Sequence, residues 1–543
     1  MNFKLTEEQE LIRKNIREFC VKNVEPIAAE IDEKEAHPAD LFKKLAEGGW
    51  MGIPIPSQYG GSGADYLTHA IVVEELSRSC SSTGFTVSIH VGIACMLINL
   101  LGSEEQKKKY LVPLATGQHL GAFVLTEPGA GTDVMAATTT AAKDGDAYVL
   151  NGTKTFISNG PLADTYLVFC WTDKAAGRKG MSSFIIPKGT PGLKPGEHFH
   201  KMGLRSSQTS EVVFKDCRVP AANLLGAEGA GMANAGVAFD HGRVGIAAQG
   251  VGIAEATYRI ARDYAASRRQ FSVAIEKLPA VRDMLIDMKT SIEAGRALLY
   301  ETSRIVDLAL AYNNQAENHP PADKEAAKRL KDNARIYKRY AGMLTPMSKY
   351  YCTEMCNRVA YDSIQVLGGS GFMRDYACER HARDARITTI YEGTSQLQIV
   401  AAVRGVCSGT AEKYLTELAA LPYDPRVSSL LAKLAEGGQQ LQEAIEFTKA
   451  QGNDYMDLHG RELVDVAIDL INGYLFCGQA STKVEMDVPV ATNGAHSSPN
   501  ACGSEYSVSG SSDSRSPTRV PPPGADSAVR PSWAPRPLMV QPR

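Results

Sequence analysis

The sequence lacks a strong charge of either sign. Its 543 residues carry 58 Lys and Arg against 61 Asp and Glu, which gives a formal net charge of −3, and no long basic block occurs. Nucleic acid is therefore not expected as the main partner, because phosphate binding needs concentrated positive charge. The amino terminus, MNFKLTEEQELIRKNIREFC, mixes acidic, basic and apolar residues, so no signal peptide is predicted.

Membrane spans and metal clusters are also expected to be absent. We expect no uncharged apolar stretch of the ~18–20 residues that a transmembrane helix needs, so no integral membrane segment is predicted. The eleven cysteines are scattered and odd in number, which is typical of reduced thiols in a cytoplasmic protein. Cys352, Cys356, Cys378 and His381 could be combined as zinc ligands. Their spacing fits a helix and includes no CxxC pair, so no metal is predicted.

The composition divides the chain into five segments and predicts a multidomain α+β fold. Residues 1–120 have helical periodicity, starting at a capping box of Thr6 and Gln9. Residues 121–232 contain short β-rich runs, which predict an antiparallel β-barrel or sandwich with turns at Asp144-Gly145, Asn151-Gly152 and Asn159-Gly160. Helical periodicity returns in 233–410 as a four-helix-bundle-like domain and continues in 411–487 as a helical extension. Residues 488–543, rich in Ser and Pro, are predicted to be disordered.

A single acidic residue stands out near the end of the third segment. The stretch ITTIYEGTSQLQ, residues 387–398, places Glu392 on a short link between two helical patterns, with no histidine or metal-type partner beside it. A glutamate in solvent is the common alternative, because most glutamates lie in water.

Seven motifs in a fixed order carry a resemblance to a known family. They are LTEPGAGTDV (125–134), NGTKTFISNG (151–160), KMGLRSSQTSEVVFKDCRVP (201–220), FDHGRVGIAAQGVGIA (239–254), RRQF (268–271), QVLGGSGF (365–372) and YEGTSQ (391–396). With them, residues 1 to about 410 resemble the acyl-CoA dehydrogenase family. The resemblance implies FAD as cofactor, an acyl-CoA thioester as substrate and an electron-transfer flavoprotein as electron acceptor. It also implies a homo-oligomer, either a tetramer or, with extra C-terminal helices, a dimer.

The resemblance implies FAD contacts from several segments of the chain. Two β segments would hold the flavin, two later stretches would reach FAD across a subunit interface, and the link after the acid would return to it. In chain order these residues are Phe123, Leu125, Thr126, Gly131, Thr132, Phe156, Ile157, Ser158, Arg268, Gln270, Phe271, Gln365, Val366, Leu367, Gly368, Gly369, Thr394, Ser395 and Gln396.

The chain departs from the family pattern at three places. Phe156 stands where many relatives have tryptophan, Ser272 where the family often has glycine, and Leu278-Pro279 where it often has Phe-Gln. Ring stacking should survive at Phe156, whereas one adenine-side contact is left open.

The resemblance also assigns a catalytic base and substrate contacts. Some relatives carry the base on the helix after the β domain, but Gly242 occupies that position here, so the base would be Glu392. Thr132, Asp240 and Arg243 would contact the CoA side of the substrate, Tyr391 would wall the acyl pocket, and Gly393 would let the thioester pass. Glu392 would remove the α proton, and an apolar site would raise its pKa toward that task.

Other functions stay open at this level. The same fold could act as an enoyl-CoA reductase or an acyl-CoA oxidase, or as a catalytically inactive flavin-fold binding protein. A dinucleotide-binding reading of AEGAGMANAG (227–236) is disfavoured, because the third spaced glycine and a parallel-sheet pattern are missing.

Overall fold

Helices form the first part of the chain. The computed structural model describes residues 5–482, and the predicted disordered segment 488–543 lies outside the described residues. The predicted capping box is confirmed, since Thr6 Oγ1 accepts from the N–H of Gln9 at 3.1 Å and Gln9 Oε1 accepts from the N–H of Thr6 at 3.0 Å. The helices are α1 (Glu7–Phe19), α2 (Ala28–Glu33), α3 (Ala39–Glu47), α4 (Tyr66–Ser79), α5 (Ser81–Ile89), α6 (Met96–Leu101), α7 (Glu104–Gln106) and α8 (Val112–Ala115).

A seven-stranded sheet follows in the order β1-β4-β2-β3-β7-β6, with β5 paired to β4. Strands β1 and β4 run parallel, and β2 also meets β4 in parallel at Thr140 and Trp171, so the sheet is mixed where the sequence predicts an antiparallel one. The strands are β1 (Gly121–Val124), β2 (Thr140–Asp144), β3 (Ala147–Ser158), β4 (Thr165–Trp171), β5 (Met181–Pro187), β6 (Leu193–Pro195) and β7 (Thr209–Pro220).

Two of the predicted turns have different outcomes, because strand pairing overrides the turn preference at one of them. Asp144-Gly145 is the β2–β3 turn, with φ +60 at Gly145. Asn151-Gly152 is not a turn but lies inside β3, at a register shift against β7, so that prediction is wrong. A Cβ at Gly152 would lie 2.4 Å from Thr139 Oγ1, so the glycine permits close approach inside the sheet.

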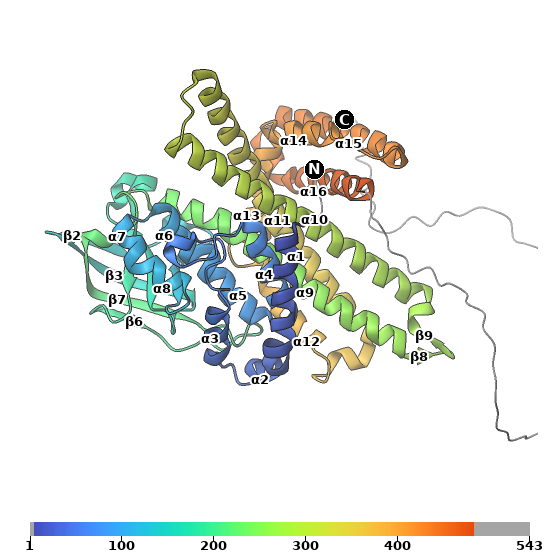
Figure 1. Cartoon of the computed structure of the whole chain (residues 1–543), viewed down its shortest axis with the longest axis horizontal. Coiled ribbons are helices and arrows are strands. Elements are labelled where there is room, and N and C mark those ends of the chain that lie inside the picture. The colour runs from blue at the N-terminus through green and yellow to red at the C-terminus, as the bar shows by residue number, and fades with distance from the viewer. Residues whose placement is uncertain (1–4, 483–543) are drawn as a thin grey trace, which may run out of the picture. The chain divides into compact units, whose positions relative to one another are not determined.

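Long helices return after the sheet (Figure 1). Helices α9, α10 and α11 pack side by side, and α4 packs on α9. The predicted fold class, with helical, β and helical parts in this order, is confirmed, while the exact domain boundaries stay predictions. The later elements are α9 (Gly231–Ser267), β8 (Arg269–Gln270), β9 (Val273–Ala274), α10 (Pro279–Asn318), α11 (Lys324–Leu367), α12 (Cys378–Arg386), α13 (Ser395–Cys407), α14 (Thr410–Ala419), α15 (Ser428–Gln451) and α16 (Asn453–Ser481).

One hydrophobic core joins the helical parts to one face of the sheet. It includes Ile93, Phe169 of β4 and Val251 of α9, all fully buried. A second core, which includes Leu344 of α11 and Val464 of α16, attaches the helical extension to the preceding helices. The burial of apolar area in both clusters is the main stabilising contribution.

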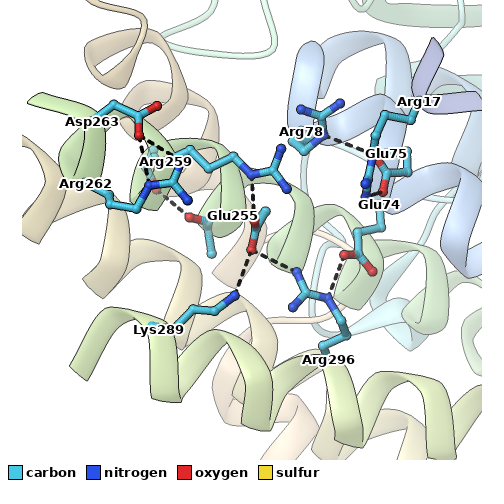
Figure 2. Close-up of polar contacts among 12 residues, drawn as sticks. Arg17, Glu74, Glu75, Arg78, Glu255, Arg259, Arg262, Asp263, Lys289 and Arg296 are labelled. Atoms are coloured by element: carbon cyan, nitrogen blue, oxygen red, sulfur yellow. Dashed lines mark hydrogen bonds and ion pairs between the residues drawn. The ribbon is translucent and has the colours of Figure 1, made fainter. Parts of the chain in front are cut away.

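A buried ion network also links the two helical parts (Figure 2). Arg296 of α10 bonds Glu74 of α4 at 2.9 Å and Glu255 of α9 at 3.0 Å. Arg259 also bonds Glu255, at 2.7 Å. Because Glu74 and Glu255 are buried, removing Arg296 would leave two carboxylates without their main cation.

The expectation that no uncharged apolar stretch reaches the length of a transmembrane helix is wrong. Ser81–Leu101 is a 21-residue stretch that is long and apolar enough to cross a membrane, but 83% of its most apolar 18-residue window is buried inside the protein. The helix Asn453–Ser481 is also long and apolar enough to cross a membrane, and 56% of its most apolar 18-residue window is buried. Burial against other helices makes Ser81–Leu101 a core segment, which length and composition alone do not reveal.

Candidate active site

Glu392 lies on a tight turn between α12 and α13. Glu392 and Gly393 both have positive φ, +52 and +87. The Gln398 side-chain amide donates to the carbonyl of Glu392 at 3.0 Å and to that of Gly393 at 2.9 Å, which holds this unfavourable backbone in place. A Cβ at Gly393 would meet Gln398 Nε2 at 2.6 Å, so the turn needs glycine there. Thr394 then begins α13 as its N-cap, accepting from the N–H of Leu397.

The carboxylate of Glu392 points into the protein. The residue as a whole is partly exposed, but its Oε2 is buried and has no hydrogen-bond partner among the described residues. A Cβ built on Gly242 of α9 would lie 3.3 Å from this Oε2 and 2.8 Å from Ile93 Cδ1. Gly242 thus provides the space beside the acid, and the alternative of a glutamate in solvent does not describe it.

Burial raises the pKa of Glu392 to about 7, while the positive charges of Lys349 and Arg243 act in the opposite direction. A carboxyl group with such a pKa exchanges a proton near neutral pH, which is the property of a general base.

Tyr391 fills the space between α5 and α9. Its ring stacks on Phe85, with centroids 4.8 Å apart and an interplanar angle of 16°. Its hydroxyl donates to Gln249 Oε1, and Gln249 Nε2 donates to Ser81 Oγ at 2.8 Å. The neighbour of the acid is therefore fixed by both stacking and a hydrogen-bond chain.

Arg243 connects the acid to the β sheet. Its Nη1 donates to Asp240 Oδ1 at 3.2 Å, and its Nε is buried without a partner among the described residues. The guanidinium lies 5.9 Å from the ring centre of Phe239, which in turn lies 6.2 Å from Phe123 of β1. Burial raises the pKa of Asp240, and the charges of Arg243 and Lys338 oppose it.

A buried ion pair supports the turn after β1. Lys154 Nζ donates to Glu127 Oε1 at 2.8 Å and to the carbonyl of Leu125 at 2.9 Å. Glu127 also accepts from the N–H groups of Thr138 at 2.6 Å and Thr139 at 3.0 Å. Burial opposes ionisation, but Lys154 and these donors lower the pKa of Glu127 to about 2. The sequence analysis missed this pair, although a lysine inside NGTKTFISNG, with apolar strand residues on both sides, was an available signal.

The predicted flavin residues of the sheet occupy one strand end and a bulge. Phe156 is 68% exposed and has φ +56, next to a register shift between Lys154 and Ile157. The side chain of Ile157 lies in the sheet core, so only its backbone can face a ligand. Thr126 and Ser158 are half-buried, whereas Gly131 and Thr132 are exposed.

The FAD contacts predicted at residues 268–271 lie away from the sheet. The hairpin β8–β9 sits at the opposite end of the long helices from the sheet (Figure 1). On it Arg268, Gln270 and Phe271 are exposed, Phe271 at 87%. One chain therefore does not bring these residues to β1 and β3, and the predicted contact across a subunit interface stays a prediction.

The remaining predicted FAD residues have mixed surroundings. Gln365, Gly368 and Gly369 are exposed at the end of α11, while the side chains of Val366 and Leu367 lie in the core. Besides Thr394, which caps α13, Ser395 Oγ donates to Glu354 Oε1 at 2.6 Å and Gln396 is exposed.

The residues present fit FAD. Glu392 Oε2 and Arg243 Nε are buried polar atoms without protein partners among the described residues, as expected beside a ligand. A Cβ at Gly131, Gly368 or Gly369 would meet nothing within 4 Å, so these backbones are open to a ligand. Phe156 presents an exposed ring suitable for stacking on a flat group.

Known proteins agree with this architecture. Models of the acyl-CoA dehydrogenase N-terminal, middle and C-terminal domains match residues 6–118, 122–217 and 229–406. A short-chain-specific acyl-CoA dehydrogenase of Clostridium acetobutylicum is 44% identical over 398 residues, which are 73% of this chain and 97% of that protein.

Two solved structures are similar over the same region. Butyryl-CoA dehydrogenase from Megasphaera elsdenii has a TM-score of 0.68 at 38% identity, covering 75% of this chain and 100% of that one. A chain described as electron transferring flavoprotein of Acidaminococcus fermentans has a TM-score of 0.68 at 41% identity, covering 75% of this chain and 99% of that one.

The chain belongs to the acyl-CoA dehydrogenase family. It is an FAD-dependent oxidoreductase that desaturates an acyl-CoA thioester, as the motifs predicted.

Proposed function

We propose that the substrate is a short-chain acyl-CoA and that Glu392 removes its α proton. The observation that carries this proposal is the buried Oε2 of Glu392, which has no hydrogen-bond partner in residues 5–482 and lies close to Gly242 and to the cations of Lys349 and Arg243. Relatives specific for short-chain and butyryl substrates support the substrate class.

The protein's own groups would act on the α carbon and the carbonyl. Arg243, held by Asp240, orients the CoA side of the substrate. The N–H of Glu392, whose turn is fixed by Gln398, donates to the thioester carbonyl and stabilises the enolate-like charge. The carboxylate of Glu392 accepts the proton as the α C–H bond breaks. When bound, FAD supplies the acceptor for the hydride from the β carbon.

Phe85 supports a short acyl chain. Its ring is 3% exposed and stacks on Tyr391, so the space directly beside the base is filled by two aromatic side chains. A long chain would have to displace this stack, which contributes about 0.5–1.5 kcal/mol beyond its buried area.

We also propose the remaining features that the resemblance implies. These are a homo-oligomer in which Arg268, Gln270, Phe271 and residues 365–369 contact FAD of a neighbouring copy, an electron-transfer flavoprotein as acceptor, and a cytoplasmic location. Phe271 and Phe372, which are 87% and 78% exposed, supply apolar surface for such a contact.

The test uses purified protein and anaerobic reduction of the flavin. Butyryl-CoA should bleach the bound flavin of the wild type, and Glu392→Gln should retain FAD but reduce flavin at least about a hundredfold more slowly. Undiminished bleaching by Glu392→Gln would overturn its role as base. Steady peroxide release equal to substrate use would instead indicate an oxidase, and protein that cannot be loaded with FAD would indicate a binding protein.

A panel of acyl-CoA thioesters tests the substrate class. Phe85→Ala should raise kcat/KM for octanoyl-CoA relative to butyryl-CoA, because the stack on Tyr391 is lost. Phe85→Leu, which keeps an apolar side chain, serves as the control with a smaller change. Equal preference in wild type for both lengths would contradict the short-chain proposal.

A further inference from the structure

Lys349 of α11 is a fully buried lysine that the mechanism above does not use. Its side chain is 0% exposed, and its Nζ donates to the carbonyl of Gly393 at 2.8 Å. A buried ammonium group is costly unless it is compensated by charge and hydrogen bonds. One carbonyl is a weak compensation, so the charges around the amine matter.

The amine lies among the groups of the active site. Glu392, Arg243 and Glu354 act on it electrostatically, and burial lowers the pKa of Lys349 to about 7. Glu392 in turn is faced by Lys349 of α11 and Arg243 of α9, while Asp240 faces Arg243. Glu354, on the same helix as Lys349, is already held by Ser395 Oγ. Of the described residues, Lys349 and Arg243 are therefore the cations that favour the ionised form of Glu392.

Lys349 also contacts the backbone of the catalytic turn. The carbonyl of Gly393 accepts from both Lys349 and Gln398, at 2.8 and 2.9 Å. These two donors come from α11 and α13, so the turn is held from both helices. Positive φ at Glu392 costs roughly 1–3 kcal/mol, and such a conformation persists only when its surroundings fix it.

We propose that Lys349 is a positioning residue for the base: its side-chain amine fixes the Gly393 carbonyl and, when protonated, supplies positive charge that favours the ionised form of Glu392. This rests on the proposed role of Glu392. The contact is direct for the backbone and electrostatic for the carboxylate, since no ion pair within 4.0 Å joins Lys349 and Glu392 among the described residues.

The experiment separates charge from hydrogen bonding. The rate of anaerobic flavin reduction by butyryl-CoA is measured against pH in FAD-loaded wild type, Lys349→Arg, Lys349→Gln and Lys349→Met. The rate should rise with pH as Glu392 ionises. Lys349→Arg keeps the charge and should keep the midpoint of this rise. Lys349→Gln keeps a donor and Lys349→Met keeps neither, and both should move the midpoint up by about one pH unit or more. Below the midpoint this is a roughly tenfold loss of rate.

A matched control uses the other fully buried lysine of the active-site region. Lys154→Met makes the same change beside Glu127. It should lower FAD content and the unfolding temperature but leave the pH midpoint where it is.

A second measurement needs no substrate. The midpoint of thermal unfolding is followed against pH in each Lys349 variant, with and without Glu392→Gln. The change in unfolding midpoint that Glu392→Gln abolishes reports the ionisation of Glu392. In Lys349→Gln and Lys349→Met this change should occur at higher pH than in wild type.

The outcomes separate the two proposals. If Lys349→Gln and Lys349→Met lower only the unfolding temperature, and both pH midpoints stay unchanged, Lys349 is a structural residue and this proposal is overturned. If wild type itself is not bleached, or Glu392→Gln is bleached at the wild-type rate, the proposed function fails. The unfolding measurement still decides whether Lys349 shifts the ionisation of Glu392.

Discussion

Two buried lysines of this protein make the same kind of backbone contact with different consequences. Lys154 donates to the carbonyl of Leu125 at 2.9 Å, and Lys349 to that of Gly393 at 2.8 Å. Both are 0% exposed, and each lies under a loop that carries predicted FAD or substrate contacts. The difference lies in the neighbouring acid.

Glu127 is held by Lys154 in a direct ion pair and by two backbone N–H groups, so its pKa falls to about 2. Within the described part of the chain, Glu392 has no such donors and its Oε2 has no hydrogen-bond partner, and burial raises its pKa to about 7. A carboxylate with a complete set of donors is fixed in one charge state, whereas one with cations at a distance can exchange a proton. Both acids are affected by burial, and the hydrogen bonds and ion pair that Glu127 receives distinguish it from Glu392, the residue proposed as the base.

The largest expected effect comes from breaking the ion pair between Lys154 and Glu127. Lys154→Met leaves Glu127 buried without its cation, which should cost about 3–5 kcal/mol of unfolding free energy and lower FAD content. Chemical unfolding and the flavin-to-protein absorbance ratio measure both. Because Lys154→Met with Glu127→Leu removes both charges, the double variant should regain most of the loss. Equal stability of single and double variants would show that the pair is not the cause.

A smaller effect is expected from placing a methyl group beside the carboxylate of Glu392. Gly242→Ala places a methyl group 2.8 Å from Ile93 Cδ1 and 3.3 Å from Glu392 Oε2. Overpacking should cost about 1–3 kcal/mol, and displacement of the carboxylate should slow flavin reduction. Gly236→Ala on the same helix is the control, because its Cβ would meet nothing within 4 Å. That variant should be slightly more stable, by up to about 1 kcal/mol. Equal effects of the two substitutions would contradict the placement of Glu392 beside Gly242.

The smallest effects are pH slopes of opposite sign, each at most about 1.4 kcal/mol of unfolding free energy per pH unit. Glu127 has a lowered folded-state pKa, so its stabilisation is present above about pH 4.5 and is lost as the pH falls toward 2. Glu392 has a raised folded-state pKa, so its contribution is present below about pH 4.5 and is lost as the pH rises through 7. Unfolding midpoints of Glu127→Gln and Glu392→Gln, each compared with wild type across pH, measure the two slopes. Slopes of the same sign would refute the contrast between the two acids.

Local patterns predicted local structure well. The capping box of Thr6 and Gln9 and the turn at Asp144-Gly145 are confirmed, because both depend on residues within a few positions of each other. Asn151-Gly152 has the same turn signature, yet it lies inside β3, where pairing with β7 outweighs the turn preference. The uncharged stretch Ser81–Leu101 is a core segment because other parts of the chain cover it.

The amino-acid order by itself determined the family, the cofactor and the succession of helical, β and helical parts, because motif residues and hydrophobic periodicity are written along the chain. Only the tertiary structure decided which groups surround the acid. Lys349 precedes Gly393 by 44 residues, and Gly242 and Phe85 belong to still more distant helices. The charge and free space around Glu392 arise where these helices meet, and no local pattern records such a meeting.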